Sequence, residues 1–68
     1  MSPAEYKQER QRRGLTQAAL AALLGVRQST VSDRERGRRE ITRESELAIK
    51  SLPLPANTEL SRNENNQQ

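Results

Sequence analysis

Arginine is the residue type in this 68-residue chain that is best suited to bind a charged ligand. Twelve residues are Lys or Arg against nine Asp or Glu, and because Lys7 and Lys50 are the only lysines, ten arginines dominate the net charge of +3. A guanidinium group is a planar fork that donates two parallel hydrogen bonds to a pair of anionic oxygens. The composition therefore favours a phosphate-bearing partner, with a solvated charged surface as the alternative.

The densest positive charge lies in residues 34–39, and Arg36, Arg38 and Arg39 are the candidate phosphate ligands there. Contacts to phosphate give affinity and register without reading a base sequence, and each neutralised phosphate steepens the fall of binding with salt. For any single one of these arginines, a solvated position without a contact is the alternative.

Cysteine and histidine are absent, which excludes thiol nucleophiles, disulfides, zinc sites of the Cys/His kind and an imidazole general base. The remaining Ser, Tyr, Lys and carboxylate groups form no visible activated set, so an enzyme is the least favoured class. We expect no cofactor, no metal and no small-molecule ligand. No apolar run reaches the roughly 20 residues of a membrane span, and a signal-peptide profile is lacking, so we expect a cytoplasmic protein without a membrane partner.

The elements that must position these side chains are short helices. Gly14, Gly25 and Gly37 each follow a stretch of helical pattern, where a left-handed residue would close the helix. Helices are predicted over residues 3–13, 17–24 and 28–36, with a fourth between Thr42 and Pro53, since proline cannot continue a helix. The expected fold is all-α, a compact bundle of four or five short helices.

Hydroxyl side chains stand where the predicted helices begin. Ser2, followed by proline and by Glu5 three positions later, forms a capping box, and Thr16 and Thr42 are further N-caps. Arg27 has no side-chain oxygen for its cap position, which costs about 1 kcal/mol.

One domain over residues 1–53, with its central motif at 16–37, is the predicted organisation. At this size a core buries only about 60% of the surface of the unfolded chain, so stability should be marginal. The tail at 54–68 has Leu54 and Leu60 as its only apolar anchors, and we expect it to be partly or wholly disordered.

The central motif has the residues that a tight pair of helices requires. Such a pair needs a small residue where the helices cross, a residue that tolerates positive φ at the turn, and an aliphatic anchor on the second helix. Ala21, Gly25 and Val31 supply these structural features. A generic helical bundle is the alternative.

These segments resemble the helix-turn-helix of Cro/phage-repressor type (XRE family) regulators over about residues 3–52. The residues that carry the resemblance are Gln17-Ala18-Ala19-Leu20-Ala21, Gly25-Val26, Gln28-Ser29-Thr30-Val31-Ser32 and Glu35-Arg36-Gly37. The resemblance implies a lambda-repressor-like domain that binds double-stranded DNA with the second helix of the motif in the major groove.

In that family the early residues of the second helix point at base edges, which here are Gln28, Ser29, Ser32 and Asp33. The amide of Gln28 can donate and accept together, as adenine requires, while serine hydroxyls are permissive. Asp33 either accepts from a cytosine amino group or pairs with a nearby arginine. Arg27 departs from the Ser or Thr often found in relatives and is a candidate for a guanine or a phosphate, unless it is a chance substitution.

The resemblance assigns further roles outside the second helix. Gln17 stands where relatives hold a phosphate with side chain and backbone amide. Arg10 and Glu35 correspond to a pair that bridges the first and third helices, and Arg10 is also a candidate phosphate ligand. Arg34 replaces an apolar residue of many members, so the packing below this helix is either thinner or uses the arginine's aliphatic stem.

The resemblance implies a transcriptional repressor that binds an approximately palindromic operator as a homodimer, with half-sites about 10 bp apart. Small regulators of this kind include phage Cro proteins, restriction-modification controllers and other autoregulators of mobile elements. The alternative is an antitoxin-like module whose tail at 54–68 engages a protein partner.

Overall fold

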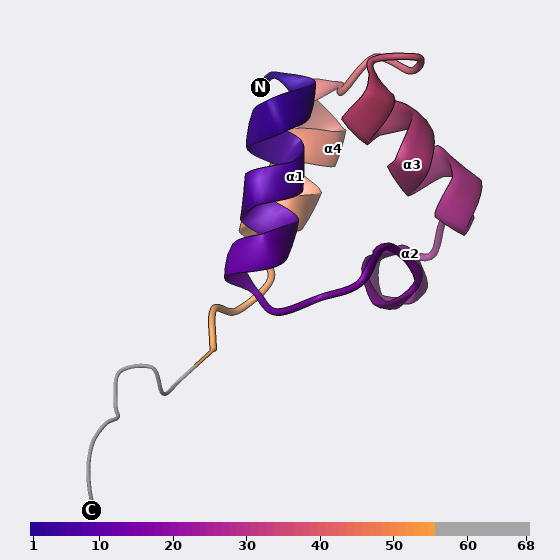
Figure 1. The fold of residues 1–68 in the computed structure, drawn as a ribbon. Helices are drawn as coiled ribbons and strands as arrows, with labels where there is room; N and C mark the ends of the chain where they lie inside the picture. Colours follow the sequence, from indigo (N-terminus) through magenta and orange to yellow (C-terminus); the bar gives the residue numbers. More distant parts are fainter. Residues whose placement is uncertain (56–68) are drawn as a thin grey trace, which may run out of the picture.

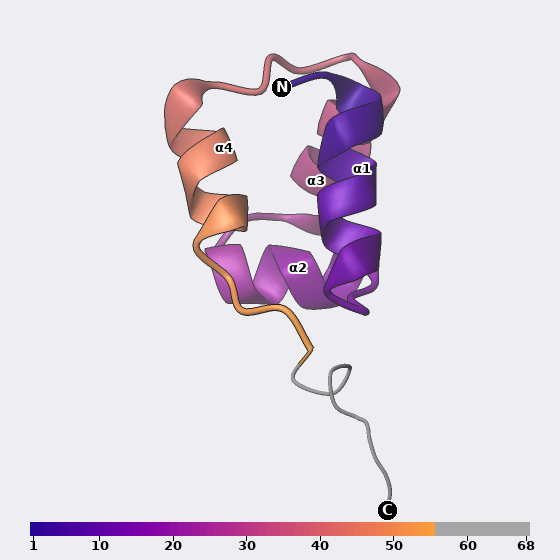
Figure 2. The same ribbon diagram turned by 90° about the vertical axis from the view of Figure 1, so that its left-hand side faces the viewer.

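The computed structural model describes residues 1–55 of the chain, and this part is all-helical, as predicted. It comprises α1 (Pro3–Arg12), α2 (Gln17–Leu24), α3 (Gln28–Arg36) and α4 (Arg43–Lys50). Helices α1, α3 and α4 surround the core, and α2 closes it from below in the views of Figures 1 and 2. No helix within these residues is long and apolar enough to cross a membrane.

Helix α1 begins at the predicted capping box. The Glu5 amide donates to the Ser2 hydroxyl at 3.1 Å, and the Ser2 amide donates back to a Glu5 carboxylate oxygen at 2.7 Å. Two backbone donors that the helix leaves unpaired are thereby satisfied. The helix ends at Arg12, and Gly14 follows with a φ of 69°, close to the predicted end of the helix.

The turn between α2 and α3 is formed by Gly25. Its φ of 71° lies in the left-handed region, which an L side chain adopts only with strain, and its amide donates to the carbonyls at the end of α2. Thr16 caps the start of α2 by accepting from the Ala19 amide at 3.0 Å. At the start of α3, Arg27 makes no side-chain cap bond, as its residue type predicts.

Helix α4 begins after Thr42, whose hydroxyl accepts from the Ser45 amide at 3.1 Å. The helix ends at Lys50, before the proline that was expected to stop it. Leu54 is exposed at the end of the described residues. The tail predicted to be disordered or to bind a partner comprises residues 54–68, of which 56–68 lie outside the part that the structure describes.

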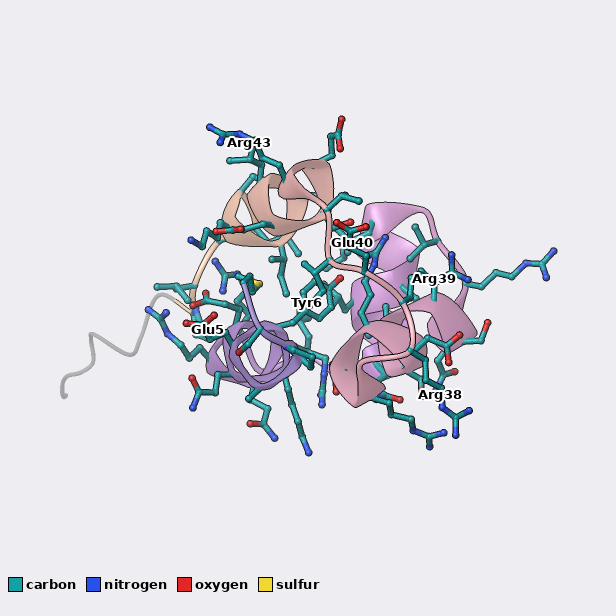
Figure 3. All side chains as sticks on the ribbon, turned by 90° about the horizontal axis from the view of Figure 1, so that it is seen from above. Glu5, Tyr6, Arg38, Arg39, Glu40 and Arg43 are labelled. Carbon is teal, nitrogen blue, oxygen red and sulfur yellow. The ribbon has the colours of Figure 1, made fainter. Side chains whose placement is uncertain are left out.

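Few side chains form the core. The buried apolar residues in the described part are Tyr6, Leu20, Ala21, Val31 and Ile49, and partly buried aliphatic side chains surround them. Figure 3 shows Tyr6 in the space between the helices. Full burial of a large apolar side chain contributes about 1.5–3 kcal/mol, so a core of this size fits the marginal stability expected for so short a chain.

Arg13 joins the end of α1 to the end of α4. Its Nε donates to the Leu52 carbonyl at 3.0 Å and one terminal nitrogen donates to the Lys50 carbonyl at 3.3 Å, while the other binds Glu9 at 2.7 Å. The Lys50 carbonyl is one of the acceptors that a helix end leaves without a partner. The Arg13 side chain thus holds the ends of two helices together.

Candidate nucleic-acid interface

The first half of α3 presents a polar face to solvent. Arg27, Gln28 and Ser29 are exposed, and Ser32 and Asp33 are partly exposed. On the opposite side of the helix Val31 is fully buried in the core. The predicted base-reading residues therefore share an accessible surface. The helix that carries them is held in place by its buried side.

The arginines of the described residues fall into two groups. Four bind to other parts of the chain and are Arg10, Arg12, Arg13 and Arg34. The side chains of a second group form no hydrogen bond or ion pair with any part of residues 1–55. This group comprises Arg27, Arg36, Arg38, Arg39 and Arg43. The second group contains every predicted DNA-contacting arginine except Arg10.

The free arginines do not all lie together. Figure 3 shows Arg38 and Arg39 on the segment that follows α3, whereas Arg43 projects from α4 on another side of the molecule. The amides of Gly37 and Arg38 both donate to the Asp33 carbonyl, so the chain turns sharply at the end of α3. This turn keeps Arg38 close to the second half of α3.

Asp33 makes no ion pair within residues 1–55, although arginines are frequent around it in the sequence. The alternative in which Asp33 pairs with a nearby arginine is therefore not found in the described structure. Its contact with a base remains a prediction.

Glu35 is the centre of a buried polar cluster between α1, α2 and α3. Arg10 donates from Nε to Glu35 Oε2 at 2.6 Å and from Nη2 to Oε1 at 3.1 Å, and its Nη1 donates to the Leu15 carbonyl at 2.8 Å. Gln17 adds a bond from Nε2 to Oε1 at 3.2 Å. The Arg10 side chain is 12% exposed and that of Glu35 is 4% exposed. The bridging pair implied by the resemblance is thus present.

This cluster bears on two predicted phosphate ligands. All three nitrogens of the Arg10 guanidinium already donate within the chain, so the geometry gives Arg10 a structural role and no support as a phosphate ligand. Gln17 uses one amide hydrogen on Glu35 and retains a second one. Its backbone amide stands at the first position of α2, where a helix favours an anion.

Sequence reasoning missed the partner of Arg34. Its Nη1 donates to the Tyr6 hydroxyl at 3.0 Å, and its guanidinium carbon lies 5.7 Å from the centre of the Tyr6 ring. The arginine thus contacts α1 with its charged head. A buried tyrosine hydroxyl needs a hydrogen-bond partner, and that requirement was the available signal.

Ion-paired carboxylates lie between α1 and α4. A pocket of about 370 Å³ there is lined by Met1, Glu5, Gln8, Glu9, Glu46 and Lys50. A hydrogen bond from Arg13, with the nearby positive charges of Arg12 and Arg13, lowers the pKa of Glu9, and Lys50 does the same for the pKa of Glu46. Arg12, Arg13, Lys50 and the amino terminus bind Glu9 and Glu46, so these positive charges are already paired within the chain.

Comparison with known proteins identifies the family. Residues 7–45 match the family model described as helix-turn-helix, which covers α2, α3 and most of α1 and spans more than half of the chain. No curated protein and no solved structure matches the chain. The chain therefore belongs to the Cro/phage-repressor (XRE) type of helix-turn-helix, a family of domains that bind DNA and regulate transcription.

Proposed function

We propose that this protein is a transcriptional repressor that binds an approximately palindromic operator as a homodimer, with α3 of each protomer in the major groove. One observation carries the proposal. The accessible half of α3 and the arginines at its end have no partners within the described residues, whereas most other arginines do. Free donors beside an exposed helix suit an anionic duplex.

The base contacts belong to the start of α3. Gln28 reads adenine with its amide, and the hydroxyls of Ser29 and Ser32 tolerate several bases. Asp33 accepts a hydrogen bond from a cytosine amino group. Arg27 lies beside the end of the helix that enters the groove and reaches a guanine or a phosphate. The exposure of these side chains supports this assignment.

The phosphate contacts lie on both sides of that surface. Arg36, Arg38 and Arg39 follow the base-reading residues, and Gln17 offers its backbone amide and its remaining amide hydrogen at the start of α2. Arg10 is left out of this set because its guanidinium is bound to Glu35 and Leu15.

The small size of the base-reading surface on α3 favours a dimer. A single domain has one recognition helix and covers one half-site, so a second copy related by twofold symmetry is needed to span a palindrome with half-sites about 10 bp apart. Occupancy of such a site at a promoter would exclude polymerase.

Two experiments test this function. A random duplex library is selected with the full chain, and the enriched sites are footprinted at low and moderate salt. The expected result is one protected palindrome, bound by a species with twice the mass of the chain in sedimentation. A reporter with that site between promoter and gene should be silenced by the wild type. Protection of a single unrepeated half-site by a monomer would contradict the dimer, and increased reporter output would contradict repression.

A further inference from the structure

Two polar links connect the second half of α3 to α1. Tyr6 and Arg10 stand one turn apart on α1, and Arg34 and Glu35 are neighbours on α3. The link between Arg10 and Glu35 is doubly hydrogen-bonded and buried. The second link, between Tyr6 and Arg34, is a single bond of 3.0 Å.

The second link is a poor source of stability. The Nε atom of Arg34 is buried and has no hydrogen-bond partner in the described structure. A buried polar atom without a partner is destabilising, and replacing buried charged groups by apolar ones of similar size is often neutral or stabilising. Replacing both members of the pair, Tyr6 by phenylalanine and Arg34 by leucine, would fill the same space and leave neither the Nε atom nor the buried Tyr6 hydroxyl unpaired.

The hydrogen bond between Tyr6 and Arg34 lies where it can orient the predicted base-reading residues of α3. Gln28 is six residues before Arg34, which is about 9 Å along a helix at 1.5 Å per residue. A tilt of α3 by about 10° at Arg34 would therefore move Gln28 by roughly 1.5 Å. Hydrogen bonds are formed over a range of only about 0.5 Å, so such a shift would break a two-bond contact with a base.

We infer that Tyr6 and Arg34 form a positioning pair that sets the orientation of α3 for sequence-specific DNA binding at the expense of stability. This inference rests on the proposed contact of α3 with DNA. Arg34 itself touches no base, and its hydrogen bond to Tyr6 prevents α3 from settling into the orientation that apolar packing alone would select.

The test compares stability and binding in the same variants. The probe is the duplex selected by the wild-type chain, and a shuffled duplex of equal length reports nonspecific binding. Arg34→Leu removes the link and the buried Nε but leaves the Tyr6 hydroxyl unpaired, and Tyr6→Phe removes only the hydroxyl. The double variant Tyr6→Phe/Arg34→Leu removes both partners. Arg12→Met is the matched control, since it removes one positive charge from an exposed position, 57% accessible, on the other side of α1.

We expect the double variant Tyr6→Phe/Arg34→Leu to unfold at a urea concentration equal to or above that of the wild type, and yet to bind the selected duplex about tenfold more weakly. Its affinity for the shuffled duplex should match that of Arg12→Met. Each single variant should lower the unfolding midpoint, because it leaves the other member of the pair without its hydrogen-bond partner. The double variant should regain the midpoint but not the specific affinity.

Each other outcome overturns the inference. Equal losses of specific affinity in the double variant and in Arg12→Met would show that only charge matters. A lowered midpoint in the double variant would show that the pair stabilises the core. If instead the wild type selects no duplex, the proposed function fails. This result differs from the two outcomes above, which require a selected duplex or a change in the unfolding midpoint.

Discussion

The carboxylate of Glu35 accepts two hydrogen bonds from Arg10, at 2.6 and 3.1 Å, across the interface between α3 and α1. The two residues are 25 positions apart in the chain, and both side chains are largely withdrawn from solvent. The same carboxylate accepts from Gln17, so three of the helices meet at one buried negative charge.

Glu35→Ala should unfold most of the protein. The change leaves the Arg10 cation buried without its partner, which costs about 3–5 kcal/mol and approaches the whole stability of a small domain. Helical circular dichroism against urea measures the loss. Glu44→Ala, at an exposed position of α4, is the control and should unfold near the wild-type midpoint. The double variant Arg10→Met/Glu35→Met should recover much of the loss, and failure to do so would mean that the pair itself is a net source of stability.

Gln28→Ala should relax the preference for one base pair of each half-site. Loss of a two-bond contact with adenine costs about 1–3 kcal/mol of discrimination, while binding to other sequences changes little. Competition among duplexes that vary at each position measures the preference. Gln8→Ala removes the same side chain from an exposed position of α1 and should leave the preference intact. An unchanged profile in Gln28→Ala would remove this residue from the reading surface.

Arg38→Ala should weaken binding to all duplexes by a similar factor. A side chain that neutralises one phosphate releases counterions, so its loss should reduce the slope of log affinity against log salt by about 0.9. Titrations at several salt concentrations on specific and shuffled duplexes give this slope. Arg12→Ala should keep the wild-type slope, since its guanidinium pairs with Glu9 instead. Loss of affinity at a single base position would argue for base contact by Arg38.

Arg27→Ser should stabilise the fold and weaken DNA binding. Serine supplies the cap bond that α3 lacks, which adds about 1 kcal/mol to the free energy of unfolding, while the positive charge beside the groove is lost. Arg36→Ser removes the same charge from the other end of α3, where serine forms no cap, and should bring no gain in stability. Undiminished affinity in Arg27→Ser would indicate that Arg27 touches neither a base nor a phosphate.

Acidification should remove the stabilising effect of Glu9. Its pKa is lowered in the folded chain, chiefly by the hydrogen bond from Arg13, so the charged carboxylate stabilises the fold above the ordinary pKa near 4.5. This contribution is lost as the pH falls through the lowered pKa. The difference in urea midpoint between wild type and Glu9→Gln should therefore be present at neutral pH and shrink in acid. A difference that stays constant over this range would contradict the pairing.

The helices could be predicted from the sequence because their signals are local. A cap depends on residues three positions apart, as in Ser2 and Glu5, and a glycine at a turn acts through its own φ. The predicted helix ends therefore lie within one or two residues of those in the structure. The burial of Val31 was predictable for a related reason, since an aliphatic residue in an otherwise polar helix must face the core.

The hydrogen-bond partners of the arginines could not be predicted in this way. Arg13 and Arg12 are neighbours in the last turn of a charged helix, yet Arg13 binds carbonyls 37 and 39 positions away and Arg12 binds only Glu9. Such partners meet only after the helices have packed, so no spacing in the sequence reports them.

The sequence by itself therefore determined the helices, the turn at Gly25 and the family of the chain, since each depends on residues close together along the backbone. Tertiary structure alone decided which arginines of residues 1–55 are bound within the chain and which have no partner there. The physical reason is that a guanidinium group on a long side chain takes the acceptors that the packed helices bring within its reach, as Tyr6 is brought to Arg34.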